Sequence, residues 1–147
     1  MENNRITLKE AEEFHGHLGP YLVLGILAGE LALKKLACKK YFGLEVKVRG
    51  ANKRPKSCLI DGLQLSTGAT YGKGNIKKLN SAIIKINFLN HINSKRLTLG
   101  FKDNLIQQLK EAKTHRDSRL LAKKLYKTDY HKLFNLTPIT QTWPSPD

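Results

Sequence analysis

A run of apolar residues with helical spacing, close to the N-terminus, is the strongest hydrophobic pattern in the chain. It covers 20–40, begins at a proline and becomes rich in lysine toward its end, and Gly43 follows as the residue that terminates it. These features predict a long, buried helix. Before it, Thr7 and Glu10 have the spacing of a capping box, which predicts a short helix over 8–14.

Small residues recur along one face of the long predicted helix. Gly25 and Gly29 are four positions apart, and Ala28 and Ala32 lie beside them. A glycine inside a helix costs about 1 kcal/mol relative to alanine, so a pair of glycines needs a compensating contact. The pattern therefore predicts that the backbone of another segment comes close to this face.

Alternating apolar and polar residues in the middle of the chain predict a sheet. The expected strands, the last two joined by a polar turn, are 44–49, 82–88 and 96–101. Residues 57–60 are either a further short strand or the lead into a helix, ended by Asp61 and Gly62. One more helical turn is possible at 63–65.

Two helices and a tail are expected after the strands. The helices cover 102–113 and 117–126, and 129–134 is expected to dock on the core. Helices first, strands next and helices last predict an α+β fold, with a long N-terminal helix packed on an antiparallel or mixed sheet and helices at the C-terminal end. We expect one domain over 1–134, with 135–147 as a proline-containing tail.

The chain is strongly basic. Its 147 residues include 26 Lys and Arg against 12 Asp and Glu, a formal net charge of +14, and its pI is about 9.9. The simplest interpretation is a well-solvated, lysine-rich surface. A nucleic-acid-binding surface is the alternative, because Asp61 is the single acid between Val46 and Phe101. No RRM, KH, zinc-finger or basic-zipper signature supports that alternative, and no run of aromatic residues lies between the cations.

The cysteines and the N-terminus bear on the cellular compartment. Cys38 and Cys58 have no CxxC spacing and give no sign of a disulfide scaffold. The first residues are polar and then acidic, unlike a signal peptide. The apolar stretch 21–33 is interrupted by Glu30 and is too short to span a bilayer. We therefore expect a cytoplasmic protein with no membrane association.

Two histidines directly before the long predicted helix are the first candidates for chemistry. His15 and His17 flank Gly16, and the dipole of the helix that begins after them disfavours a positive charge. Neutral imidazole binds metal ions and accepts protons. The alternative is a pair of ordinary, hydrogen-bonded histidines. The remaining histidines are expected to be solvated: His91, His115 and His131.

Cys58 and Asp61 could complete a site with these histidines. A thiolate beside imidazoles forms a mixed Cys/His site for Zn²⁺ or another divalent transition metal, and Asp61 would orient a ligand or act as a base. Alternatively, Cys58 is a thiol nucleophile that His17 activates without a metal. The purely structural alternative is a buried Cys and an Asp that caps the following turn.

A loop rich in glycine and hydroxyl residues covers 66–75. It is not a phosphate-binding P-loop, because three residues instead of four separate Gly68 from Gly72, and Gly74 stands where a hydroxyl is required. Its backbone amides and Lys73 could still cradle an anion. The alternative is a tight connection with glycines at positive φ. The residues expected to hold a small anionic ligand are Thr67, Gly68, Thr70, Gly72, Lys73 and Gly74.

Three segments, taken together in this order, resemble the FmdE family, the E-subunit family of formylmethanofuran dehydrogenase. They are 14–20 (FHGHLGP), 58–64 (CLIDGLQ) and 67–75 (TGATYGKGN). The similarity covers roughly residues 7–101. The resemblance implies an α+β core, a homodimer, and an occurrence mostly in archaea and anaerobic bacteria, with a link to one-carbon metabolism such as methanogenesis. It also implies a metal site built from His15, His17 and Cys58.

The sequence departs from that family's pattern at two positions. Many members have a cysteine where Gly19 stands and another where Ala69 stands. Many also carry a C-terminal cysteine-rich zinc finger, whereas no cysteine follows Cys58 here, so the chain corresponds to the family's core. The family enzyme reduces CO₂ onto methanofuran at a molybdenum or tungsten pterin in other subunits, and nothing in this sequence is suited to hold that cofactor.

The leading hypothesis is therefore a metal-binding accessory protein with a His/Cys pocket and an anion-binding loop. In it, His15 is a third ligand or a proton carrier, and Asp61 orients a ligand or acts as a base. Two alternatives stay open: a metal-independent Cys/His enzyme acting on a small anionic substrate, and a basic nucleic-acid-binding protein.

Overall fold

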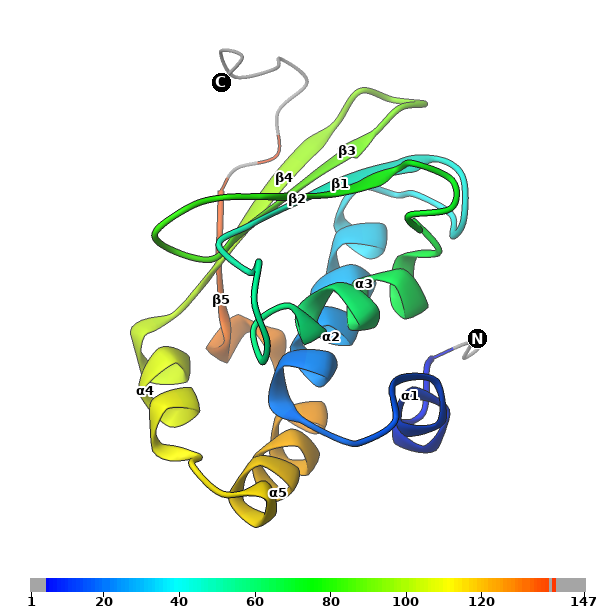
Figure 1. Ribbon diagram of the computed structural model, residues 1–147. Coiled ribbons are helices and arrows are strands. Elements are labelled where there is room, and N and C mark those ends of the chain that lie inside the picture. The colour runs from blue at the N-terminus through cyan, green and yellow to red at the C-terminus, as the bar shows by residue number, and fades with distance from the viewer. Residues whose placement is uncertain (1–4, 138, 140–147) are drawn as a thin grey trace.

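Two helices at the centre of the molecule, α2 (Pro20–Lys35) and α3 (Cys58–Thr67), pack side by side beneath a five-stranded sheet (Figure 1). The computed structural model describes residues 5–137 and 139 of the chain. Ten residues of α2 are buried, which agrees with its nearly continuous apolar sequence. The predicted α+β class, with helices packed on a mixed sheet, is confirmed.

The sheet contains the three predicted strands and two that the sequence did not predict. Its strands are β1 (Leu44–Arg49), β2 (Ile76–Leu79), β3 (Lys85–Asn90), β4 (Arg96–Phe101) and β5 (Phe134–Leu136). They lie in the order β2-β1-β3-β4-β5, with β1 and β2 parallel and the other neighbours antiparallel. The strands expected at 44–49 and 96–101 are confirmed, and the one expected at 82–88 lies at 85–90.

The two unpredicted strands lie at the edges of the sheet. The β2 strand is four residues long and half lysine, and β5 pairs with β4 through Leu136 opposite Leu99 and Phe134 opposite Phe101. Residues 135 and 136, which the sequence assigned to the tail, are therefore part of the sheet. Such short edge strands carry too few residues for a clear alternation, so their neighbours in the sheet decide them.

The first helix, α1 (Leu8–His15), has the predicted capping box. The hydroxyl of Thr7 accepts a hydrogen bond from the amide of Glu10 (3.1 Å), and the Glu10 carboxylate accepts one from the amide of Thr7 (2.9 Å). Farther along α1, Glu12 forms an ion pair with Arg119 of α5 (His115–Tyr126) through two hydrogen bonds, at 2.9 and 3.2 Å. This pair ties the N-terminal helix to the C-terminal half of the chain.

The close approach predicted on the bare face of α2 is present, and its partner is α3. A Cβ placed on Gly25 would lie 2.1 Å from the carbonyl oxygen of Leu59, and one on Gly62 would lie 2.1 Å from that of Leu22. The Ser66 hydroxyl lies in the same contact, within hydrogen-bond distance of the carbonyls of Gly25 (3.1 Å) and Gly62 (2.9 Å). Glycine on both helices is what allows their backbones to touch.

The α2 helix ends at Lys35, five residues earlier than the sequence predicts. The side-chain amides of Asn90, the last residue of β3, and Asn93, in the turn that follows, donate hydrogen bonds to the carbonyl of Leu36 at 2.8 and 3.1 Å. The next residue, Ala37, has a φ of 51°, which a helix does not allow. The sheet therefore terminates this helix, although its lysine-rich sequence could have continued.

The strand alternative at 57–60 is wrong, and the helical alternative is right. The α3 helix begins at Cys58 and runs without interruption through Asp61 and Gly62, which the sequence placed at its end. Gly62 is a poor helix former, but its lack of a side chain is required for the contact with α2. Tertiary packing overrides local propensity at this position.

Three helical segments surround the lower part of the molecule in Figure 1: α4 (Asp103–Glu111), α5 (His115–Tyr126) and the short 3₁₀ helix η1 (Tyr130–Lys132). The first two correspond to the predicted C-terminal helices. Within the described part of the chain, no helix is both long and apolar enough to cross a membrane.

Candidate functional site

The corner between α1 and α2 carries the two candidate histidines. His15 is the last residue of α1, and Gly16 ends that helix with a φ of 106°, a conformation that glycine adopts without strain. His17 then lies in the short connection before Pro20 starts α2. The left-handed turn at Gly16 brings the two imidazole rings to 4.8 Å between centroids.

Asp61 of α3 lies against His15. The Nδ1 atom of His15 and the Oδ2 atom of Asp61 are 2.6 Å apart, and the His15 side chain is 11% exposed against 36% for Asp61. A carboxylate can only accept, so Nδ1 carries the proton and donates it, which in a neutral imidazole leaves the lone pair on Nε2. The sequence suggests His15 and Asp61 as candidates without pairing them. The structure brings them into contact, and this contact sets the tautomer of the neutral ring.

His17 is exposed, and besides His15 it has the imidazole of His115 next to it. The His115 ring, at the start of α5, lies edge-on to His17 with 6.4 Å between centroids. A Cβ on Gly19 would lie 3.3 Å from the Cε1 atom of His17, so the ring packs over this glycine. The sequence predicts a solvated His115, and it is exposed, but its place beside His17 could not be inferred from a position almost 100 residues away.

Cys58 is the first residue of α3, one helical turn before Asp61. It is a free thiol and half-buried. Burial raises the pKa of the Cys58 thiol, the Asp61 carboxylate raises it further, and Arg54 opposes the shift. A raised pKa keeps the thiol protonated at neutral pH, which disfavours the hypothesis of an activated nucleophile.

The three predicted metal ligands do not form one set. Among the residues that the structure describes, no three His, Cys, Asp or Glu side chains are grouped so that they could hold a metal ion together. The chemistry of the corner still fits a metal in part, because His15 and His17 are neighbouring imidazoles and a carboxylate orients one of them. Cys58 is not a member of such a group.

Several backbone amides of the glycine-rich loop have partners within the chain. The Ala69 amide donates to the Thr67 hydroxyl (3.0 Å), that of Thr70 to the Asn75 side chain (2.8 Å), and that of Lys73 to the Thr70 hydroxyl (3.2 Å). The Gly74 amide donates to the Thr70 carbonyl (3.0 Å). These bonds favour the alternative of a tight connection, and anion binding by this loop stays a prediction.

The loop and the histidine corner also belong to different ends of α3. Gly68 ends the helix with a φ of 77°, seven residues after Asp61, which is about 10 Å along a helix axis. A Cβ on Gly68 would lie 2.6 Å from the ring of Tyr41, so this end of α3 packs against the segment before β1. The Lys73 ammonium lies 5.4 Å from the centre of the exposed Phe42 ring.

Fold and site together define the class of protein: an α+β domain with a His–Asp pair at the corner between α1 and α2. The chain belongs to the FmdE family, described as "FmdE, Molybdenum formylmethanofuran dehydrogenase operon", whose family model matches residues 14–137. The match begins at the residue before His15 and includes the whole sheet.

Two relatives illustrate the range of the similarity. A tungsten formylmethanofuran dehydrogenase FmdE-like protein from Syntrophus aciditrophicus has the same fold, with a TM-score of 0.62 and 17% identity over 93% of this chain and 71% of that one. A probable S-adenosyl-L-methionine-binding protein from Archaeoglobus fulgidus is 33% identical over 73 residues. That match covers 47% of this chain and 19% of the archaeal protein, so the chain spans about a fifth of that relative.

Proposed function

We propose that the protein is an accessory protein related to formylmethanofuran dehydrogenase, and that its His15–His17 corner binds one divalent transition metal ion such as Zn²⁺. Membership of the FmdE family supports the accessory role and the context of one-carbon metabolism. The contact that carries the metal proposal is the 2.6 Å hydrogen bond from His15 to Asp61. It holds one ring nitrogen and leaves the other free to coordinate.

Two imidazoles would be the protein ligands in this proposal. A carboxylate that accepts from the far nitrogen of a ligating histidine fixes the ring and makes it more basic, as the second shell of metal sites generally does. Asp61 has this place relative to His15. A metal held by two protein ligands keeps positions for water or for a small molecule. In this role the protein residues bind and orient, and no reaction step is assigned to them.

Zinc titration of the full chain, purified without a polyhistidine tag, tests the proposal. Calorimetry should give about one Zn²⁺ per chain, and His15→Ala or His17→Ala should abolish binding. Asp61→Asn should weaken it by about 10- to 100-fold, the usual effect of losing an outer-shell partner. The matched control is the double variant His91→Ala/His131→Ala, which removes two histidines outside the corner and should bind as the parent does.

Cys58→Ser decides whether the thiol belongs to the site. Because Cys58 is not part of a three-residue group with the histidines, the variant should keep its zinc affinity. A loss of affinity in this variant would restore the three-ligand set that the family resemblance implies. Zinc binding that persists in the His15→Ala/His17→Ala double variant would contradict the proposal.

Proton transfer without a metal is the second candidate, and the same His15–Asp61 contact favours it. The carboxylate would orient the ring and stabilise its protonated form, while Nε2 exchanged a proton with a bound molecule. If the folded protein bound no zinc at saturating concentrations, the metal proposal would fail and proton transfer would be the remaining candidate.

The homodimer expected from the resemblance is also part of our proposal. Light scattering coupled to gel filtration should give twice the mass of the chain.

A further inference from the structure

A cavity of about 700 Å³ lies between α4 and the end of the sheet where β3 begins and β4 finishes. Its size is within the range of small-molecule sites, about 300–1,000 Å³. Neither histidine of the α1–α2 corner lines it, so it is separate from the candidate metal position. Leu105 is the buried residue of α4, and the next apolar residues of that helix, Ile106 and Leu109, line the cavity.

One part of the cavity wall is apolar and accessible to solvent. Ile83 is 61% exposed and Ile106 is 38% exposed, and both line the cavity together with Ile84, Phe101 and Leu109. Large apolar side chains that remain in contact with water around a concave surface favour a ligand with a hydrocarbon or aromatic body.

The charged residues of the lining are mainly cationic. Lys56 lies in the turn before α3, Lys85 begins β3 and Lys110 lies near the end of α4, so three separate segments each contribute a lysine to the lining. Asp103 is the acidic residue among those described in the lining. Three positive charges against one negative charge favour an anionic group on the ligand over a neutral or cationic one.

We propose that this cavity binds a small amphipathic anion, a molecule with an apolar body of medium length and one carboxylate or phosphate group. The body contacts the isoleucines and Phe101, and the charged group is held by the lysines. This site does not depend on the proposed metal function, because it uses other residues.

Three probes with the same alkyl chain and different charge test the proposal: octanoate, octan-1-ol and octylammonium. Methyl resonances of Ile83, Ile106 and Leu109, followed by NMR on the full chain, should shift with octanoate at millimolar concentration. We expect octanoate to bind more tightly than octan-1-ol, and octylammonium to bind most weakly. The variant Lys56→Gln/Lys85→Gln/Lys110→Gln should lose about five- to tenfold in octanoate affinity, given the modest worth of exposed ion pairs.

The matched control removes the same charge elsewhere. Lys9→Gln/Lys113→Gln/Lys124→Gln changes three exposed lysines outside the lining and should keep octanoate binding close to that of the parent. Equal loss in both triple variants, equal affinity for octylammonium and octanoate, or no shift of these methyl groups would each overturn the proposal. The His15→Ala/His17→Ala variant should still bind octanoate, so failure of the metal proposal is distinguishable from failure of this one.

Discussion

A single methyl group added at the contact between α2 and α3 should destabilise the whole domain. Gly62→Ala places a Cβ at 2.1 Å from the Leu22 carbonyl oxygen, 2.8 Å from the Ile26 nitrogen and 2.9 Å from the Gly25 Cα. All three are backbone atoms of α2, so no side chain can rotate away to make room. Because non-bonded carbon–oxygen contacts are about 3.3 Å or longer, the two helices must separate by about 1 Å.

The magnitude follows from what this separation disturbs. The Ser66 hydroxyl, 3.1 Å from the Gly25 carbonyl, moves out of hydrogen-bond range, which costs about 1 kcal/mol. Overpacking in a core costs about 1–3 kcal/mol, and alanine returns about 1 kcal/mol through its better helix propensity. The net loss is therefore about 1–3 kcal/mol, a substantial part of the roughly 5–15 kcal/mol typical of a domain.

Urea unfolding followed by far-UV circular dichroism measures this loss. In a thermal scan, the melting temperature of this 147-residue chain should fall by roughly 3–12 °C. Gly100→Ala is the control, because a Cβ there meets no atom within 4 Å and its φ is not positive. It should change the free energy of unfolding by less than about 0.5 kcal/mol. If Gly62→Ala were no more destabilising than Gly100→Ala, the direct backbone contact would be refuted.

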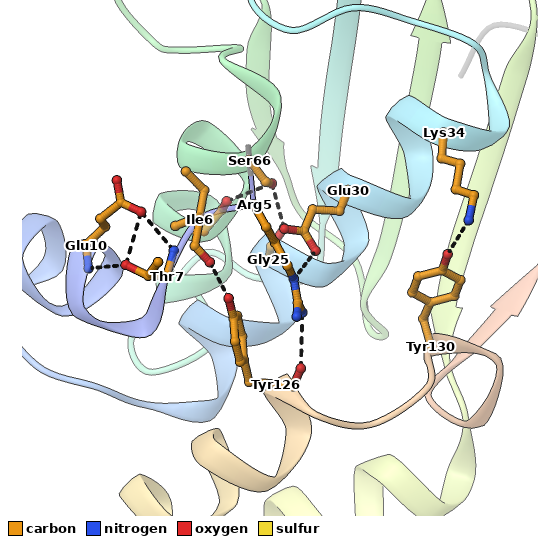
Figure 2. A network of polar contacts seen from close by, with 11 residues as sticks. Arg5, Ile6, Thr7, Glu10, Gly25, Glu30, Lys34, Ser66, Tyr126 and Tyr130 are labelled. Carbon is orange, nitrogen blue, oxygen red and sulfur yellow. Dashed lines mark hydrogen bonds and ion pairs between the residues drawn. The ribbon is translucent and has the colours of Figure 1, made fainter. Parts of the chain in front are cut away.

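Two glutamates should give opposite pH dependence of stability. Burial raises the pKa of Glu30, although its ion pair with Arg5 at 3.2 Å opposes the shift (Figure 2). The parent should therefore lose stability as pH rises above the unfolded pKa of this carboxyl. Glu30→Gln keeps the side chain neutral, so its free energy of unfolding should increase relative to that of the parent as pH rises from about 4.5 to 7. The hydrogen bond from Arg119 lowers the pKa of Glu12, so the cost of Glu12→Gln should be constant near neutral pH and should shrink as pH falls below about 4.5. The same pH trend for both variants would contradict the assignment. Burial raises the pKa of both cysteine thiols, Cys38 and Cys58. Iodoacetamide at neutral pH should therefore alkylate each of them more slowly in the folded chain than in urea. Rapid alkylation of Cys58 that is lost in His17→Ala would instead support the hypothesis of an activated nucleophile.

Part of the candidate site followed from local sequence. A glycine between two histidines, just before a proline, predicts an irregular corner, and Gly16 turns there with a φ of 106°. That corner brings two rings together over only two positions in sequence, so local geometry suffices to explain it. The bond from His15 to Asp61 joins residues 46 positions apart, and it depended on α3 continuing through Gly62.

The glycine-rich loop shows why a motif alone leaves its role open. The composition of 68–74 is compatible both with an anion cradle and with a tight turn. The difference is whether the backbone amides have partners, and the side chains of Thr67, Thr70 and Asn75 provide them. Hydrogen-bond partners of this kind are fixed by the folded loop, and composition does not reveal them.

The sequence by itself determined the elements that local chemistry specifies. These are the capping box of α1, the alternating apolar and polar residues of β1 and β4, and the apolar, helical pattern of α2 with glycines on one face. Tertiary structure decided where α2 ends, because Asn90 and Asn93 cap it, and it decided the edge strands β2 and β5, which depend on their neighbours. Tertiary structure also decided which residues surround His15 and His17, since Asp61 and His115 come from helices that are distant in sequence. Local propensity acts over a few residues, whereas a site is assembled by packing across the whole chain.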